Sequence, residues 1–423
     1  MALVSELELP AFDYTDASMR GERFHLTMRE LRAGGWLAEG PYGYIALDRE
    51  SAEFFLRTRS AIFPGMKIAE IFGVTEGALY EQMKHNVLHV NGPDHTRLRS
   101  LVNPALSARA VERYRPAMRG FLEELFERAL AAPAATDGAT RRGTVRCDFV
   151  EAFAKPYPSL VIAEVMGAPL ADAPRLHHWS NWIQKQFDAA SMASEREGIE
   201  RAVEEFYEYA GALVRARRED PGDDLISKLI AAADPAHPPE RLSEEECVNL
   251  VFNVLVGGVD TSQSQLAHAI RLLAENPEQW ARLAEDPSLA GAAVEEALRY
   301  EPITPFTARI LTEEVTYRDV TFPVDTIVMV CAFTGNRDLE EDERGPAGPE
   351  SFDITVERRH ARTLTFGAGV HYCLGANLAR LELEEGLAFL SSRLRGVELD
   401  GEPEFGTISG IYGLDRLPIR FSV

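Results

Sequence analysis

The sequence predicts a mainly helical fold with small β-sheets built from the start and the end of the chain. Apolar residues recur at helical spacing over most of the 423 residues, whereas stretches with strand-like alternation are few. No domain linker and no internal repeat divides the sequence, so we expect one domain, residues 1–423. Helices are predicted at about 22–33, 49–58, 94–106, 109–132, 150–167, 172–188, 194–218, 223–232, 243–275, 277–285, 289–301 and 374–393.

The remaining segments are strands and loops. The stretch 131–143, AAPAATDGATRRG, is typical of a surface loop between two helices. The stretch 60–92 combines glycine and proline with large apolar side chains, and a long irregular segment of this kind is usually functional. The alternative for 60–92 is a loop with one short helix packed on the core. Strands are predicted at Tyr42–Leu47, Thr307–Tyr317 and Thr326–Phe333, with a C-terminal set near 397–423.

Charge and cysteine usage exclude several classes of protein. The 67 acidic and 44 basic residues give a formal net charge of −23, which should repel nucleic acid and anionic lipid. No apolar run reaches the ~18–20 residues of a membrane span, and the acidic N-terminal segment is unlike a signal peptide. The cysteines form no CxxC pair, so neither a zinc ribbon nor a disulfide framework is expected. We therefore expect a cytoplasmic protein with reduced thiols, in which Cys147, Cys247 and Cys331 are small buried apolar residues.

The fourth cysteine, Cys373, lies in the segment 366–375, FGAGVHYCLG. Gly367, Gly369 and Gly375 allow tight turns and a close approach to a flat ligand. Cys373 stands just before an amphipathic helix, where the helix dipole and free N–H groups favour a thiolate. A thiolate can bind a metal, and as an axial haem ligand it promotes O–O cleavage. The alternative is a glycine-rich loop with an incidental buried cysteine.

This segment resembles the haem-binding signature of cytochromes P450, F-x-x-G-x-x-x-C-x-G, with the histidine that many bacterial members have two residues before the cysteine. The resemblance implies a P450-like helical prism with small β-sheets, and haem b (iron protoporphyrin IX) as the cofactor. It also implies that Cys373 is the axial ligand of the iron and that Phe366 packs beside the ligand loop. His371 would reach a haem propionate, and Gly375 would belong to the cofactor-binding loop.

A second motif lies inside the predicted helix 243–275. Gly257 and Gly258 cost roughly 1 kcal/mol each relative to alanine, which indicates a local widening that admits a ligand or water. The neighbouring Asp260 and Thr261 could then relay protons. The alternative is a close helix–helix contact with Asp260 solvated. The segment resembles the family motif A/G-G-x-D/E-T, which implies that Asp260 and Thr261 deliver protons during dioxygen activation and that both glycines make room over the haem.

Glu296 and Arg299 are three residues apart and share one face of a predicted helix. A solvated pair, which would contribute little, is the alternative interpretation. The two residues match the E-x-x-R motif of the family, which implies a structural pair that supports the ligand loop. Ser351 stands where the family often has an arginine or histidine as a third member, so we expect Arg358 or Arg359 to replace it.

Two propionate carboxylates buried in a protein need paired cations. His95 and Arg99 are one turn apart at the start of a predicted helix, and Arg309 lies in a strand-like stretch. The family has cations at the matching positions. The resemblance therefore assigns His95, Arg99, Arg309 and His371 to the haem propionates, and Arg97 should point elsewhere, to the surface.

The implied reaction is that of a monooxygenase, which activates O2 reductively and inserts one oxygen atom into a small apolar organic substrate. The sequence contains no flavin or iron–sulfur segment, so electrons are expected from a separate ferredoxin and ferredoxin reductase. We expect neither nucleic acid nor a membrane as a partner. A non-catalytic haem-binding sensor or carrier is the alternative function.

Two surfaces are predicted for these partners. The basic run 357–362, together with Arg109, Arg113 and Arg380, is a candidate docking site for an acidic ferredoxin, with a solvated face as an equal alternative. The substrate cavity should be mainly apolar. Its predicted walls are the stretch 60–92, the stretch 182–187 with Trp182, Ile183 and Phe187, Val254 and Leu255, Ile303–Phe306, and Ile411–Tyr412.

Overall fold

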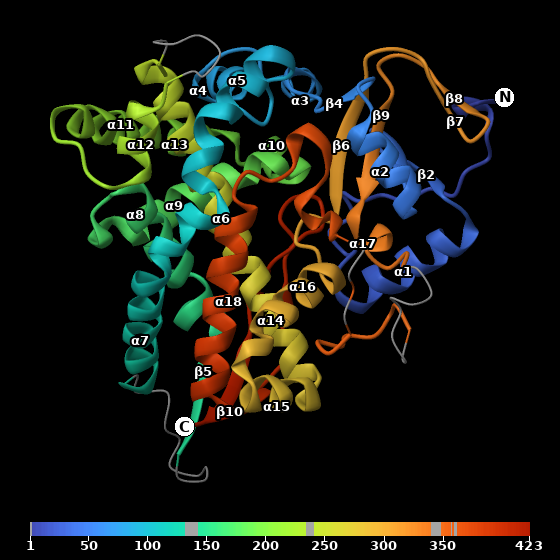
Figure 1. Ribbon diagram of the computed structural model, residues 1–423. Coiled ribbons are helices and arrows are strands. Elements are labelled where there is room, and N and C mark those ends of the chain that lie inside the picture. Colours follow the sequence, from blue (N-terminus) through green and yellow to red (C-terminus); the bar gives the residue numbers. More distant parts are fainter. Residues whose placement is uncertain (1, 132–142, 234–240, 340–347, 357, 359–361) are drawn as a thin grey trace.

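Helices make up most of the molecule, and several of them pack around the long C-terminal helix α18 near its centre (Figure 1). The computed structural model describes residues 2–131, 143–233, 241–339, 348–356, 358 and 362–423. The α-helices are α1 (Gly21–Gly34), α2 (Arg49–Arg57), α3 (Met66–Ile71), α4 (Ala78–His85), α5 (Gly92–Val102), α6 (Ala108–Val111), α7 (Arg115–Ala131), α8 (Pro156–Met166), α9 (Ala173–Gln184), α10 (Ala189–Ser194), α11 (Arg196–Glu219), α12 (Leu225–Ala231), α13 (Glu244–Gly258), α14 (Asp260–Glu275), α15 (Pro277–Glu285), α16 (Ala290–Tyr300), α17 (Ala332–Gly335) and α18 (Ala376–Arg393). Two short 3-10 helices bear on the site, η7 (Lys185–Phe187) and η11 (Gly369–His371).

The strands form four small sheets. The largest has the order β2-β3-β9-β6-β4, in which β3 and β9 are parallel and the other neighbours antiparallel; it lies beside α1, α2 and α17 (Figure 1). The others have the orders β1-β8-β7, β10-β13-β5 and β11-β12. The strands are β1 (Ala2–Leu3), β2 (Leu37–Gly40), β3 (Gly43–Ala46), β4 (Ala61–Ile62), β5 (Thr144–Asp148), β6 (Phe306–Leu311), β7 (Val315–Tyr317), β8 (Val320–Phe322), β9 (Ile327–Cys331), β10 (Arg395–Leu399), β11 (Glu404–Phe405), β12 (Leu414–Arg416) and β13 (Pro418–Ser422).

The hydrophobic core follows this division into helices and sheet. One large cluster of buried apolar side chains joins α7, α8, α9, α11, α13, α14 and α18. A second cluster lies between α2 and the five-stranded sheet. Helix α18 packs against α7, α14, α15 and α16, so it is covered on several sides. No helix of the described residues is long and apolar enough to cross a membrane.

The predicted mainly helical fold is confirmed, and three predicted elements need correction. The predicted helix 243–275 is two helices, α13 and α14, which are separated at Val259 with φ −89° and ψ −71°. The stretch 60–92 contains two short helices, α3 and α4, rather than one. The stretch predicted as one helix at 109–132 starts with α6 and a 3-10 turn before α7 begins. Most of the loop predicted at 131–143 lies outside the described residues.

Strand β5 is not predicted by the sequence pattern. Its sequence, TVRCD, has Val145 as its one fully buried residue, so it lacks the alternation of a half-buried strand. It is a strand because it pairs antiparallel with β13, where Val145 stands opposite Phe421. Such a long-range pairing leaves no local signal.

Candidate active site

The loop around Cys373 runs from η11 to the start of α18. The backbone N–H of Cys373 donates to the carbonyl of Phe366 at 2.9 Å, which closes the loop. Gly367 and Gly369 have φ values of +68° and +72°, a region that favours glycine. A Cβ on Gly369 would lie 2.4 Å from the carbonyl oxygen of Leu56, so the loop in this form requires glycine there. The sequence prediction of tight turns in this loop is confirmed.

Opposing effects act on the Cys373 thiol. Burial raises its pKa, and the N–H groups of Gly375 and Ala376 and the charges of Arg99 and Arg380 act in the opposite direction. The helix N-terminus therefore lowers the pKa of the thiol as expected, but burial has the larger effect in the protein without a bound metal. Coordination to a metal reverses the balance, because a coordinating thiol is deprotonated.

The four side chains predicted to hold propionates, His95, Arg99, Arg309 and His371, line the same cavity as Cys373. We call them the cation cluster. The rings of His95 and His371 lie 4.2 Å apart between centroids. Arg309 is 2% exposed, and His95 Nε2 has no hydrogen-bond partner among the described residues. Within that part of the chain, no member of the cluster forms an ion pair with a carboxylate.

Burial without a counter-charge shows in the pKa values of the cation cluster. Burial lowers the pKa of Arg309 to about 10. It lowers the pKa of His371 to about 3, helped by the charges of His95, Arg309 and Arg99. His371 Nε2 donates to Asn91 Oδ1 at 3.0 Å, which leaves its Nδ1 available. The cluster therefore fits a buried group with two carboxylates, as haem has, because such a group supplies the missing negative charge.

At the junction between α13 and α14, side chains donate hydrogen bonds to backbone carbonyls. Two successive backbone carbonyls, of Val256 and Gly257, each accept a hydrogen bond from a side chain. Gln184 Nε2 donates to the first and Thr261 Oγ1 donates to the second at 2.5 Å, while Ser180 Oγ lies 3.5 Å from the carbonyl of Leu255 and donates its hydrogen to Asp260. Insertion of side chains at backbone carbonyls is a known cause of helix bending. Helix α9, which carries Ser180 and Gln184, thus helps to hold the break.

The adjacent glycines at the break have different surroundings. A Cβ on Gly258 would lie 2.4 Å from Cδ1 of Ile162 on α8, so Gly258 permits close helix packing. A Cβ on Gly257 would meet nothing within 4 Å. Both residues border the cavity, but the open space is at Gly257. The helix–helix contact that was the alternative interpretation of this motif therefore explains Gly258.

Asp260 and Thr261 face in different directions. Asp260 is 5% exposed, accepts hydrogen bonds from Ser180 Oγ and from Asn181 Nδ2 on α9, and does not line the cavity. Burial raises the pKa of Asp260, and the bond from Ser180 and the charge of His177 oppose this only in part. Thr261 does line the cavity. The alternative of a solvated Asp260 is wrong, because the carboxyl group is enclosed between two helices.

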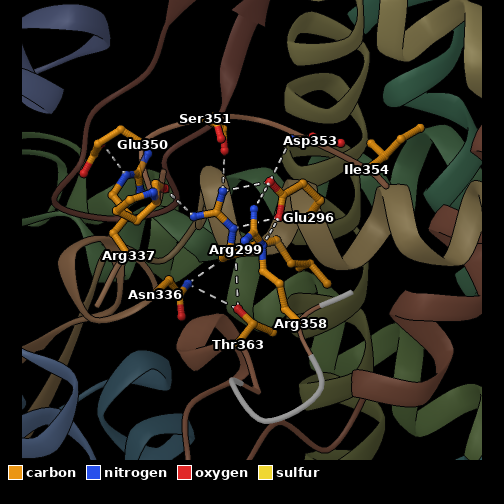
Figure 2. A network of polar contacts seen from close by, with 12 residues as sticks. Glu296, Arg299, Asn336, Arg337, Glu350, Ser351, Asp353, Ile354, Arg358 and Thr363 are labelled. Carbon is orange, nitrogen blue, oxygen red and sulfur yellow. Dashed lines mark hydrogen bonds and ion pairs between the residues drawn. The ribbon is translucent and has the colours of Figure 1, made fainter. Parts of the chain in front are cut away.

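The predicted pair of Glu296 and Arg299 is a buried ion cluster with a third member (Figure 2). Both side chains are 4% exposed, and Arg299 donates Nε to Glu296 Oε2 at 2.7 Å and Nη2 to Oε1 at 2.8 Å. Arg358 approaches the same carboxylate with Nε and Nη2 at 2.9 and 3.0 Å. Although burial raises the pKa of Glu296, the hydrogen bonds from the two arginines hold it below its usual value. The solvated pair is excluded, and Arg358 is confirmed as the replacement for the missing partner.

The same cluster reaches the loop that precedes the cysteine. Arg299 also donates to the carbonyls of Pro349 and Ser351, and Glu296 accepts from the backbone N–H of Asp353 at 2.9 Å (Figure 2). Arg358 comes from the same connecting segment. The cluster therefore ties α16 to the chain that leads into the Cys373 loop, as the resemblance implied.

The predicted ferredoxin-docking surface needs correction. The Arg358 side chain is 7% exposed and bound to Glu296, so it cannot contact a partner protein. Arg113 pairs with Asp223 and Arg380 pairs with Glu295. Residues 357 and 359–361 of the basic run lie outside the described residues. Arg97, predicted to point to the surface, is partly buried and pairs with Glu246.

The cavity above Cys373 has a volume of about 480 Å³ and mainly apolar walls. Several of the side chains predicted for its walls do not line it: Trp182, Ile183, Leu255, Pro305, Tyr412 and, within the stretch 60–92, Ile62 and Leu79 among others. Tyr412 is fully buried, and its hydroxyl accepts from the backbone N–H of Gly21. The confirmed wall residues include Phe63, Ile68, Ile71, Phe72, Phe187, Val254, Ile303, Phe306 and Ile411, and the predicted cofactor residues Phe366 and Gly375 lie in the same wall.

Comparison with known proteins assigns the family. The family model "Cytochrome P450" matches residues 50–396. The chain belongs to the cytochrome P450 family. The luteothin monooxygenase of Streptomyces thioluteus is 32% identical over 418 residues, 98% of this chain and 96% of that protein. The mycinamicin IV hydroxylase/epoxidase of Micromonospora griseorubida is 36% identical over 328 residues, 77% of this chain and 76% of that protein. The crystal structure of CalO2 is similar with a TM-score of 0.86 and 29% identity, covering 98% of this chain and 99% of that one.

These similarities confirm the resemblance seen in the sequence. The fold is that of a cytochrome P450, the protein is a cytochrome P450 monooxygenase, and haem is its cofactor. A non-catalytic haem sensor or carrier is not favoured, because the relatives are named as monooxygenases and hydroxylases. The roles of individual residues and the extent of the domain, residues 1–423, stay predictions.

One residue of this cytochrome P450 site, Glu382 on α18, was not singled out from the sequence. It is 1% exposed, borders the cavity and accepts from Ser262 Oγ at 2.8 Å. Its Oε1 has no hydrogen-bond partner among the described residues. Burial raises the pKa of Glu382 from 4.5 to about 8, and the bond from Ser262 opposes this only in part. In the sequence it is one of several acids on an amphipathic helix, so only the packing around α18 reveals it.

Glu382 should make the stability of the protein depend on pH. The folded chain holds this proton up to about pH 8, whereas the unfolded chain releases it near 4.5. The free energy of unfolding should therefore fall by on the order of a few kcal/mol as the pH rises through this window. Glu382→Gln should remove this fall, as measured by urea unfolding at several pH values. The matched control is Glu384→Gln, at a half-exposed position of the same helix; parallel curves for wild type and Glu382→Gln would contradict the assignment.

Proposed function

We propose that Cys373 is the iron ligand of this cytochrome P450 and that the cation cluster holds the two haem propionates. The observation that carries the proposal is that one cavity brings together the cysteine, two arginines and two histidines, and that these four side chains have no carboxylate partner among the described residues. When bound, haem supplies the redox chemistry that activates dioxygen. The protein residues fix its position through the sulfur and through the cations.

We infer that Asp260 and Thr261 move protons into the cavity. Asp260 is enclosed but touches Asn181, whose side chain reaches the surface, so it can exchange protons with solvent through α9. Burial raises its pKa, which favours the protonated carboxyl group that a proton donor needs. Thr261 gives its own hydroxyl hydrogen to the carbonyl of Gly257 and therefore presents oxygen lone pairs to the cavity. It can accept the hydrogen bond that guides a proton donor to the reacting centre.

The Thr261→Ala variant should keep its haem and lose coupling between electron use and product. Without the hydroxyl group, no oxygen at this position accepts the hydrogen bond that guides the proton donor. The ratio of product to NAD(P)H consumed should therefore fall several-fold. Ser264→Ala is the control, because Ser264 lies on the same helix and does not line the cavity. Equal ratios in wild type and Thr261→Ala would reject this role.

For the substrate we propose a bulky, largely apolar natural product. The apolar walls support this proposal, as do the relatives, one of which is named for mycinamicin IV. A substrate-induced spin-state screen against a library of such compounds should find ligands. Their conversion should then incorporate one oxygen atom from 18O-labelled O2; hits that never become oxygenated products would contradict the proposal.

For the electron source we propose a separate ferredoxin and ferredoxin reductase. The net charge of −23 favours docking at a locally basic surface. Arg362 stays a candidate contact, whereas Arg358 does not. Turnover that needs NAD(P)H, a ferredoxin and a reductase together is the expected result of reconstitution, and turnover independent of the ferredoxin would reject this partner. A cytoplasmic location stays a prediction.

A further inference from the structure

Two glutamines in the cavity wall have side-chain oxygens without a partner. Gln184 ends α9 and Gln186 lies in η7, and both residues line the cavity. They are 8% and 2% exposed. Gln184 Nε2 donates to the carbonyl of Val256, and Gln186 Nε2 donates to the carbonyl of Ile183 at 3.0 Å. The Oε1 atoms of both glutamines have no hydrogen-bond partner among the described residues.

The bonds made by the amide nitrogens fix which atom of each glutamine is free. Rotating either amide by half a turn would place its oxygen against a backbone carbonyl, which cannot donate. The unpaired atom is therefore an acceptor in both residues. A buried acceptor without a donor costs about 1–3 kcal/mol, and native proteins contain few of them. A ligand that brings a hydrogen-bond donor would remove this cost.

The charges around the cavity restrict the kind of donor. Its charged or ionisable wall residues, among those the structure describes, are the cation cluster, Cys373, Glu382 and the phenols Tyr14 and Tyr42. The wall residues next to Gln186 in the chain are uncharged, but Asp188 lies close behind them: its Cβ would be 3.4 Å from a Cβ on Gly410, its carboxylate accepts from the backbone N–H of Ser191 and from the hydroxyls of Thr407 and Ser409, and it does not line the cavity. Lys185, between the glutamines, pairs with Glu195 and does not line the cavity. A carboxylate at this wall would meet two acceptors and the nearby Asp188 carboxylate, so a free acid is disfavoured here.

A third glutamine in the wall, Gln265, belongs to a different region. Its Nε2 donates to the carbonyl of Glu301 at 3.2 Å, and its Oε1 also lacks a partner among the described residues. It follows Ser262 by three residues on α14, so it shares the helix face that turns toward Glu382. We therefore separate it from the pair on α9 and η7.

We propose that the Oε1 atoms of Gln184 and Gln186 are acceptors for hydroxyl groups of the substrate, so that the enzyme prefers neutral, hydroxylated apolar compounds to free acids. This inference rests on the proposed function and names the substrate class of the same site. A neutral hydroxyl group donates to a glutamine oxygen without bringing an unpaired charge into the wall. A site that hydrogen-bonds a hydroxyl group also rejects analogues that lack it, because its polar atoms then stay unpaired.

The test uses the haem-loaded protein and ligands that report binding without turnover. The probes are imidazoles attached to linear alkyl chains of hexyl to dodecyl length, ending in a methyl, a hydroxyl or a carboxylate group. The imidazole nitrogen binds the iron, and the Soret shift gives Kd. At one or more chain lengths the alcohol should bind about tenfold more tightly than the alkyl compound, and the acid should bind most weakly. In Gln184→Leu/Gln186→Leu the alcohol and the alkyl compound should bind equally.

Gln263→Leu is the matched control. Gln263 is as buried as Gln184, at 8% exposure, but its Oε1 accepts from His177 Nε2 at 2.9 Å and it does not line the cavity. This variant should keep the preference for the alcohol. If the double variant fails to fold, Gln186→Met keeps the bond from Gln184 to the backbone, and it should reduce the preference about threefold.

The possible results distinguish failure of the glutamine subsite from failure of the proposed iron site. Alcohol and alkyl probes that bind with equal Kd at every length in wild type would overturn the subsite, because water would then satisfy the acceptors equally well, while the haem site would stand. Tightest binding of the acid would overturn the charge argument. Absence of any Soret shift with all probes would instead contradict the proposed iron site.

Discussion

The Cys373→Ser variant is expected to lose the strongly red-shifted Soret band that a thiolate-ligated haem gives when reduced and bound to carbon monoxide. Serine preserves the size of the side chain, and the loop is held by backbone features that do not need the sulfur. A hydroxyl group cannot supply the electron density of a thiolate, so monooxygenase activity should fall to background. The absorbance spectrum of the reduced, carbon-monoxide-bound protein measures this directly.

The same substitution at another cysteine serves as the control. Cys147 lies in β5, is partly buried and has a pKa raised to about 12 by burial, so it does not act as a thiolate. Cys147→Ser should keep the red-shifted band and the activity. A red-shifted band that persists in Cys373→Ser, or that disappears in Cys147→Ser, would contradict the assignment of the iron ligand.

The second large effect is expected at Glu296. Glu296→Gln keeps the volume of the side chain but removes the carboxylate that Arg299 and Arg358 share, and leaves the guanidinium group of Arg299 buried without a counter-charge (Figure 2). Breaking a buried ion cluster in this way costs about 3–5 kcal/mol. Because the cluster ties α16 to the segment before the Cys373 loop, haem retention should fall together with stability. Urea unfolding midpoints and the ratio of Soret to protein absorbance measure the two effects.

The neighbouring position provides a control that differs only in burial. Glu295 pairs with Arg380, and the two side chains are 47% and 31% exposed. Exposed pairs contribute about 0–1 kcal/mol. Glu295→Gln should therefore leave the unfolding midpoint and the haem content close to those of wild type. If both variants lose stability equally, the effect comes from α16 in general and not from the buried cluster.

Much of the site could be predicted because its residues are local in sequence. The Cys373 loop, the two glycines before Asp260 and the pair three residues apart on α16 are each short patterns with a physical meaning. In the structure the Cys373 loop turns at its glycines and the pair on α16 is in contact, whereas only Gly257 of the two glycines is open. The helices of the mainly apolar core were predictable for the same reason, because a buried helix face repeats with the period of the helix.

The unpredicted features depend on contacts between distant segments. The sequence left Arg358 and Arg359 open as the third member of the Glu296 cluster, because both lie near the right place along the chain. Whether Asp260 is solvated or enclosed depends on Ser180 and Asn181, about eighty residues earlier. In the sequence Glu382 cannot be told from the other acids of the same helix, Glu384 and Glu385; its place beside the cavity follows only from the packing of α18 against other helices.

The two adjacent glycines, Gly257 and Gly258, combine a feature that is local in sequence with one that depends on a distant segment. From the sequence both were expected to open space, since both cost helix stability. The structure shows that Gly258 is required by one methyl group of Ile162, whereas Gly257 is open. The sequence shows that two adjacent glycines are unusual in a helix. Which of them is needed for packing depends on the neighbouring helix α8.

The cation cluster also bears on how the protein reaches its mature state. Arg309 and its neighbours are enclosed without carboxylate partners among the described residues, so their burial has a cost that a bound anionic cofactor would offset. A ligand that binds only the native state stabilises it by mass action. If the cluster holds the haem propionates as proposed, we expect polypeptides that never acquire haem to open more often and to be degraded sooner than the loaded enzyme.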